Sequence, residues 1–238
     1  MKNLFSEITL FFRRGCGGIL LKAGILSAGW FLLPFWLFVV VALGFYFIPL
    51  FQPFRLWLPY LAALFLSGII SPNIWTAALL GILFFLILGI KDLILISRFS
   101  AYEILVYLLL FVIFLNYFSR FGNVDNLAGI LWALAIAFLS FFLLRGFKTW
   151  SGSGELGQRE ELAAGLTALL VWQVILIVLF LPLNFFYQTA ITLLTTVILA
   201  GLFIKYREDK LDRRTLLMGF SMFFALLAFI LASNQWGL

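Results

Sequence analysis

The residues best suited to bind a ligand are uncharged polar side chains in two late apolar segments. They are Gln173, Gln188, Thr192 and Thr195. The last three recur at helical spacing, so they fall on one stripe of a helix. Gln173 and Thr192 lie on either side of the turn at Pro182. At a rise of ~1.5 Å per residue, each would lie ~14 Å deep, near the middle of a bilayer. This pattern predicts a polar lining for a pocket or path, or hydrogen bonds that hold two helices together.

Charged residues are absent from the centres of the apolar segments. Glu103 stands at the start of one segment, where the dipole of the helix favours a carboxylate. Lys91 and Asp92 stand near the end of another, where a lysine can reach the headgroups and pair with a neighbouring acid. Pumps and ion-coupled transporters generally need an ionisable residue in the pathway. An intramembrane enzyme would depend on Glu103 or Asp92, and we assign no catalytic residue.

Other kinds of site are excluded by composition. The chain has no histidine and a single cysteine, Cys16. Histidine-ligated haem, zinc sites with several Cys and His ligands, and Ser-His or Cys-His pairs are therefore ruled out. The sequence shows neither a P-loop nor a dinucleotide-binding glycine motif. We predict no metal site, no cofactor and no binding of nucleic acid, and expect the protein not to be an enzyme.

The elements that carry these residues are apolar segments long enough to cross a bilayer. The chain is 65% hydrophobic and 11% charged, against roughly 25% charged in soluble proteins. In lipid the backbone must satisfy its own hydrogen bonds, so the segments must be helices. We predict an all-α, polytopic integral membrane bundle with seven or eight transmembrane helices. The segments are 24–48, 54–70, 74–96, 101–118, 127–146, 161–181, 184–204 and 215–232.

The order of the loops suggests a weak internal repeat. Two uncharged Pro-Asn turns, at 71–73 and 182–184, each join two segments as a hairpin, and a basic loop follows each hairpin. A duplication of four helices would relate residues 24–118 to residues 127–232. We expect residues 1–23 to form an amphipathic segment in the interface and residues 24–238 to form one transmembrane domain.

Basic residues predict the orientation of the chain. Three clusters belong on one face: Lys91 and Arg98; Arg145, Lys148 and Arg159; and the run from Lys205 to Arg214. The positive-inside rule places them in the cytoplasm and the C-terminus on the non-cytoplasmic side of the cell membrane. Eight crossings would then leave the basic N-terminus outside, against the rule. A segment that returns to the same face would remove this conflict. The candidates are 24–48, which Pro34 bends, and the short segment 54–70.

Small residues four apart predict close packing between helices. The pairs are Ala77 and Gly81, Ala133 and Ala137, Ala164 and Ala168, and Ser221 and Ala225. They predict a compact bundle. The absence of catalytic and ion-pathway residues favours a non-enzymatic structural or assembly subunit of a membrane complex. The expected partners are a bilayer with anionic headgroups and another membrane protein. The alternative is a permease, or a substrate-binding membrane component, for transport of an uncharged or lipophilic compound.

Overall fold

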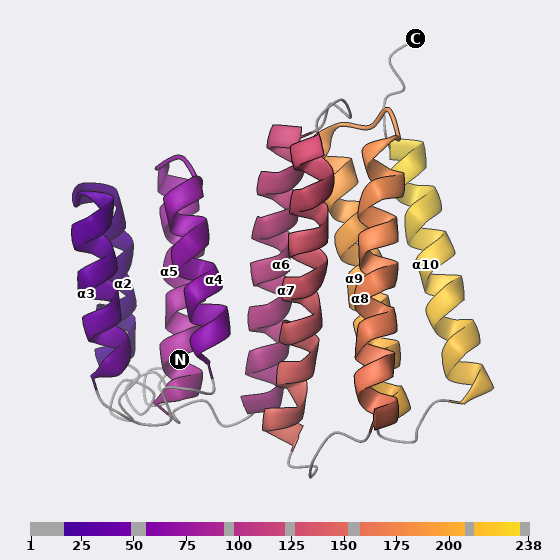
Figure 1. The fold of residues 1–238 in the computed structure, drawn as a ribbon, viewed down its shortest axis with the longest axis horizontal. Helices are drawn as coiled ribbons and strands as arrows, with labels where there is room; N and C mark the ends of the chain where they lie inside the picture. The colour runs from indigo at the N-terminus through magenta and orange to yellow at the C-terminus, as the bar shows by residue number, and fades with distance from the viewer. Residues whose placement is uncertain are drawn as a thin grey trace, which may run out of the picture. The chain divides into compact units, whose positions relative to one another are not determined.

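The computed structural model describes residues 17–48, 56–92, 98–121, 127–151, 158–207 and 212–233. These ranges contain nine helices and no strand (Figure 1). The all-α prediction is thus confirmed for them, and their composition is that of a multi-pass membrane protein. Seven or eight crossings stay a prediction. Five of the helices are long and apolar enough to cross a membrane: α5 (Ile74–Lys91), α6 (Arg98–Phe121), α7 (Leu127–Ser151), α8 (Gln158–Leu179) and α9 (Phe185–Arg207).

The chain forms two compact units, Met1–Leu109 and Leu110–Leu238, and the boundary between them lies inside α6. In the first unit, α2 (Gly17–Leu32) packs against α5 and α3 (Phe35–Phe47), and α4 (Trp57–Ile69) packs against α5 (Figure 1). Residues 1–16 of the predicted interfacial segment lie outside the described residues, and residues 17–23 belong to α2. The predicted repeat stays untested.

The expected single span at 24–48 is two antiparallel helices, α2 and α3. Proline disfavours a helical conformation in the residue before it. Accordingly α2 ends at Leu32, and Pro34 adopts φ −56° and ψ 142° as the N-cap of α3. The sequence predicted that Pro34 bends this segment and left open whether the segment crosses once or returns to the same face. In the structure the chain reverses its direction at Pro34. Both ends of the α2–α3 hairpin therefore lie at one end of the unit.

The first three helices of this unit are short. The lengths are 16 residues in α2 and 13 residues each in α3 and α4. At ~1.5 Å per residue, α3 and α4 are about 20 Å long, less than the ~30 Å hydrocarbon core. The Pro-Asn turn at 71–73 joins α4 to α5 as predicted, and the Asn73 N–H donates to Thr76 Oγ1 at 2.9 Å.

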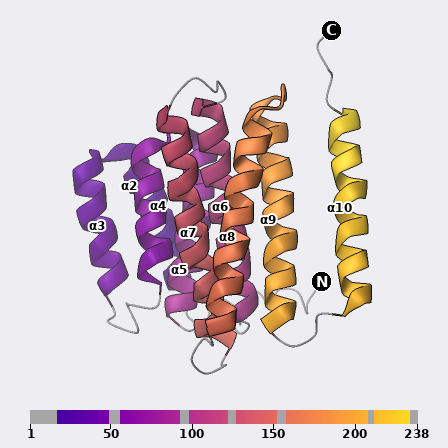
Figure 2. The same cartoon turned by 45° about the vertical axis from the view of Figure 1, so that its right-hand side comes forward.

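The second unit is built from longer helices that pack in chain order, α7 on α8, α8 on α9, and α9 on α10 (Arg213–Ser233). The helix α10 lies at the edge of this unit, next to α9 (Figure 2). The predicted turn at 182–184 joins α8 to α9, where Asn184 Oδ1 accepts a hydrogen bond from the Phe186 N–H at 3.4 Å.

Three of the four predicted small-residue pairs lie where helices pack. Ala133, Ala137, Ala164 and Ala168 are all buried. In the first unit, a Cβ added at Gly81 would stand 3.3 Å from the Cβ of Ser27, and the Ser27 hydroxyl donates to the Ala77 carbonyl at 2.7 Å. The close approach of α2 to α5 therefore depends on the Ala77–Gly81 pair.

Candidate functional site

The predicted polar stripe is largely satisfied by the backbone around it. Gln188 is buried and its Nε2 donates to the carbonyls of Val178 and Leu181, at 3.2 and 3.3 Å. These carbonyls lie at the end of α8 and in the turn after it, where they also accept the N–H groups of Leu181 and Leu183, at 3.1 and 2.7 Å. Gln188 thus closes the α8–α9 hairpin instead of facing an open path.

The threonines of α9 donate within their own helix. Each hydroxyl bonds the carbonyl four residues earlier, at 2.7 to 2.9 Å, in Thr189, Thr192, Thr195 and Thr196. This back-bonding is a common way for threonine to satisfy its hydroxyl inside a helix. Thr192 is fully buried and Thr195 is half-buried.

The structure does not bring Gln173 to this stripe. Gln173 is exposed on α8, while Val171, Ile175 and Val178 of the same helix are buried. The predicted contact between Gln173 and Thr192 across the hairpin is therefore not formed. Gln188, Thr192 and Thr195 share α9 as the spacing indicated, but the three side chains bond backbone carbonyls and Gln173 stands apart from them.

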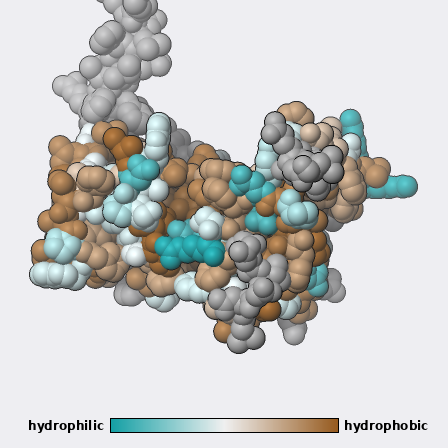
Figure 3. Space-filling model, turned by 90° about the horizontal axis from the view of Figure 1, so that it is seen from above, coloured by the Kyte–Doolittle hydropathy of each residue, from teal (hydrophilic) through white to brown (hydrophobic). Residues whose placement is uncertain are grey.

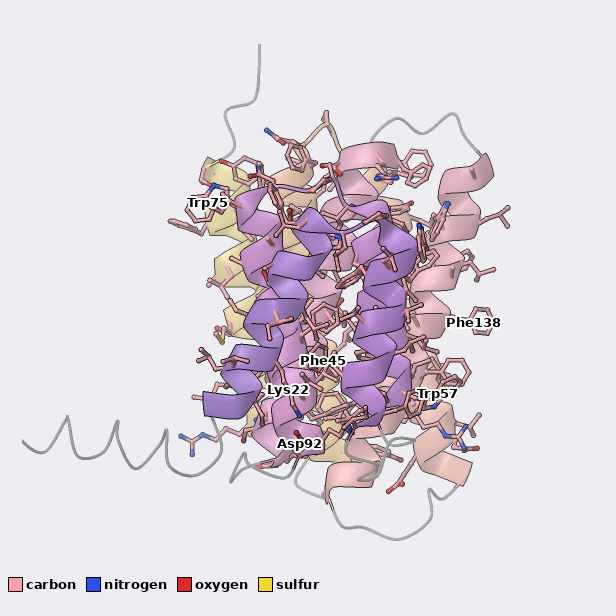
Figure 4. The ribbon with its side chains drawn as sticks, turned by 90° about the vertical axis from the view of Figure 1, so that its left-hand side faces the viewer. Lys22, Phe45, Trp57, Trp75, Asp92 and Phe138 are labelled. Atoms are coloured by element: carbon pink, nitrogen blue, oxygen red, sulfur yellow. The ribbon has the colours of Figure 1, made fainter. Side chains whose placement is uncertain are left out.

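Charged residues gather instead in the first unit, and we call Lys22, Lys91 and Asp92 the charged cluster. Asp92 Oδ2 lies 3.8 Å from Lys22 Nζ, and Asp92 Oδ1 lies 4.0 Å from Lys91 Nζ. The Lys91 side chain is 0% exposed, although lysine is almost never fully buried without a partner. Figure 4 shows Lys22 and Asp92 together at one end of the unit. The Asp92 carboxylate is therefore the shared counter-ion of the two ammonium groups.

Tyrosines complete the surroundings of Lys91. Its ammonium donates to the carbonyl of Tyr46, in the last turn of α3, and lies 5.1 Å from the centre of the Tyr46 ring. Carbonyls in the last turn of a helix have no partner within it, so Lys91 caps α3 from α5. The Tyr46 ring stacks on Tyr60 of α4, with centroids 4.1 Å apart. Lys91 thereby links α5 to α3 and, through the ring of Tyr46, to α4.

The charged cluster and Tyr46 lie together because each of these residues is near the end of a helix. Lys22 is near the start of α2, Tyr46 near the end of α3, and Lys91 at the end of α5. Because α2 and α3 reverse at Pro34, all three fall at one end of the unit. Trp57 lies at this end too and Trp75 at the opposite one (Figure 4), as expected for aromatic residues at membrane interfaces.

The sequence analysis identified Lys91 and Asp92 as a pair at a helix end but missed Lys22, Tyr46 and Tyr60. A full reversal of the chain at Pro34 would have placed Lys22 beside Asp92. Glu103, the other candidate carboxylate, accepts a hydrogen bond from the Tyr107 hydroxyl one turn further along α6, at 3.2 Å.

The charged cluster can act through electrostatic attraction. Two ammonium groups and one carboxylate can hold helices together or bind an anion. Among the described residues, no group of three or more His, Cys, Asp or Glu side chains could hold a metal ion. Compared with known proteins, the chain matches no family model, no curated protein and no solved structure.

Proposed function

We propose that this chain is a non-enzymatic structural or assembly subunit of a complex in the cell membrane. The proposed contact for its partner, a transmembrane helix of another protein, is α10. The apolar part of α10 runs from Leu216 to Ile230. In every described residue of this helix the side chain is at least partly exposed. Side chains on the opposite side from α9 are therefore open to a neighbour.

The proposal rests on the direction in which Ser221 and Ala225, the fourth predicted pair of small residues, face on α10. A Cβ at Gly219 would face Leu202 of α9 at 3.8 Å, which marks the side of α10 that packs. At about 100° per residue, the opposite side carries a stripe of exposed small residues. This small stripe consists of Ser221, Ala225, Ala228 and Ala232.

Large side chains border the small stripe on both sides. Leu217 and Phe224 flank one edge, and Met218 and Phe229 flank the other, each more than 60% exposed. Small residues between large ones let a second helix approach closely, which is how helices associate in lipid. The other three pairs of this kind lie at packed positions in the chain, so the outward pair on α10 favours a helix from outside it. Many large hydrophobic side chains along the helices are exposed, as contact with lipid or membrane partners requires. Figure 3 shows the helix ends from above, with hydrophilic residues among the hydrophobic ones.

The proposed topology follows from the α2–α3 hairpin. Because the hairpin begins and ends on one face, seven crossings by α4 to α10 would put the N-terminal basic residues on the same face as the three basic clusters. The positive-inside rule then places that face in the cytoplasm and the C-terminus outside. This arrangement removes the conflict that eight crossings create.

The test replaces a small residue of α10 by a large one in the full chain. Ala225→Leu fills the small stripe, whereas Ala135→Leu makes the same change at an exposed position of α7. Proteins purified in mild detergent from the source membrane are weighed as intact complexes. We expect a stoichiometric membrane protein with the unsubstituted chain and Ala135→Leu, and its loss with Ala225→Leu. A chain that purifies alone, or only as copies of itself, would refute the proposal.

The permease alternative stays a prediction based on the polar stripe. The hydrogen bonds of Gln188 and the threonines to backbone carbonyls leave few polar groups for a ligand there. No feature of the described residues favours this alternative over an assembly role.

A further inference from the structure

We propose that the charged cluster binds the phosphate of an anionic membrane lipid, with Lys22 as the residue that donates to it. This site is in the first unit and is independent of the role proposed for α10. The cluster carries two positive charges and one negative charge. The Lys91 ammonium is closed off from solvent, and excess positive charge beside a buried ammonium is costly, so an anion at Lys22 would stabilise the described part of the cluster.

Among the residues that the structure describes, Lys22 has partners for fewer hydrogen bonds than its ammonium can donate. Its ammonium carries three N–H donors, yet its one polar partner among the described residues is Asp92, at 3.8 Å. That distance is an ion pair too long for a hydrogen bond. The Lys22 side chain is 28% exposed, whereas that of Lys91 is closed off. A phosphate oxygen can therefore reach Lys22 from outside, and Lys91 adds attraction from within.

The surface beside Lys22 suits a lipid better than a free ion. Leu21, Ile25 and Leu32 follow one side of α2 and are 63%, 44% and 76% exposed. At about 100° per residue they lie next to Lys22 around the helix. A phosphate at Lys22 would thus leave the acyl chains of the lipid along this apolar side. Basic sites between transmembrane helices on the cytoplasmic face are known to hold anionic headgroups.

The experiment measures lipid binding to the full chain in nanodiscs. Phosphatidylglycerol is titrated into phosphatidylcholine discs, and the midpoint of thermal unfolding and the number of bound lipids by native mass spectrometry are recorded. The variants are Lys22→Gln and Lys22→Arg. The control is Arg145→Gln, which removes a cation that is paired with Glu161 at 3.0 Å in the second unit. Circular dichroism in phosphatidylcholine alone reports whether each variant is folded.

We expect Lys22→Gln to weaken the apparent affinity for phosphatidylglycerol about fivefold. Lys22→Arg and Arg145→Gln should bind as the unsubstituted protein does. Unchanged binding by a folded Lys22→Gln variant, or equal stabilisation by phosphatidylcholine, would overturn the proposal. Inorganic phosphate added to phosphatidylcholine discs should have no effect, and equal stabilisation by it would show that the site takes a free ion.

A second measurement uses the unsubstituted protein, in case Lys22→Gln does not fold. Phosphatidylglycerol with a photoreactive group in its acyl chain is incorporated into the discs and activated by light. We expect cross-links on the α2 peptide that contains Leu21 and Ile25. Cross-links spread evenly over the exposed helices would contradict a site at Lys22.

Discussion

The two units of the chain use their few polar groups in different ways. In the first unit, helices of 13 to 18 residues bring three charges together, with a lysine fully buried among tyrosines. In the second unit, helices of 21 to 25 residues hold hydroxyl and amide groups that bond nearby backbone carbonyls. Its described ion pair, Arg145 with Glu161, is half exposed. Among the described residues, a fully buried charge thus occurs in the first unit, whereas buried hydroxyl and amide groups of α9 in the second unit bond backbone carbonyls.

This difference follows from helix length. Where α3 ends after 13 residues, its last carbonyls need a donor, and Lys91 reaches Tyr46 from the longer α5. Lys91 is thus buried at the end of α5 because it caps the shorter helix α3. In the second unit α8 and α9 are nearly equal in length and meet at a tight turn, where N–H groups of the turn and the Gln188 side chain both donate to the carbonyls.

The largest predicted effect is the loss of the shared carboxylate. Asp92→Asn removes the carboxylate that faces both Lys22 and Lys91 and should lower the free energy of unfolding by about 3 kcal/mol. Glu161→Gln breaks the exposed pair of the second unit and should cost less than about 1 kcal/mol. Reversible unfolding in mixed micelles, followed by circular dichroism, measures both. Equal losses would remove the distinction between buried and exposed charge.

A smaller effect is expected from closing the space between α2 and α5. Gly81→Leu forces a side chain against Ser27, and overpacking of this kind costs about 2 kcal/mol. Gly165→Leu is the matched change in the second unit, because nothing lies within 4 Å of a Cβ at that position. It should leave stability unchanged or slightly raised, since leucine favours a helix more than glycine does. The same unfolding experiment compares the two, and a neutral Gly81→Leu would contradict close packing of α2 on α5.

The smallest effects concern the polar stripe. Gln188→Leu removes a donor from two carbonyls at the end of α8 and should cost about 1 kcal/mol. Thr192→Val removes a hydroxyl that bonds its own helix and should cost about 0.5 kcal/mol or less. Thermal unfolding ranks the two variants. If Thr192→Val proved the more damaging, the hydroxyl would have a partner beyond its own helix.

Much of this fold could be predicted because membrane helices need long apolar segments. The Pro-Asn turns at 71–73 and 182–184, and the spacing of small residues, also predicted hairpins and close contacts. The sequence left a return of residues 24–48 to the same face open beside a single crossing, because these residues are almost all apolar. Neither hydropathy nor a polar loop separates two short helices from one long helix there, and proline is compatible with a bend as well as a break.

The candidate site was harder to predict. Spacing placed Gln188, Thr192 and Thr195 on one helix, but α8 is apolar on nearly every side and gives no signal of which side is buried. For that reason the sequence could not predict that Val171 and Ile175 are buried and that Gln173 is exposed. The charged cluster depends on the reversal at Pro34, which the sequence left open, so the pairing of Lys22 with Asp92 was not predicted.

The most direct test of the account asks on which face of the membrane the two ends of the α2–α3 hairpin lie. Single cysteines at Gly18, Ile48 and Ser71, in a Cys16→Ser background, are labelled in oriented vesicles with a membrane-impermeant maleimide. The hairpin predicts that Gly18→Cys and Ile48→Cys react from the same face and Ser71→Cys from the opposite one. Labelling of Gly18→Cys and Ile48→Cys from opposite faces would mean that residues 24–48 cross once, which would contradict the α2–α3 hairpin and separate Lys22 from Tyr46 and Lys91.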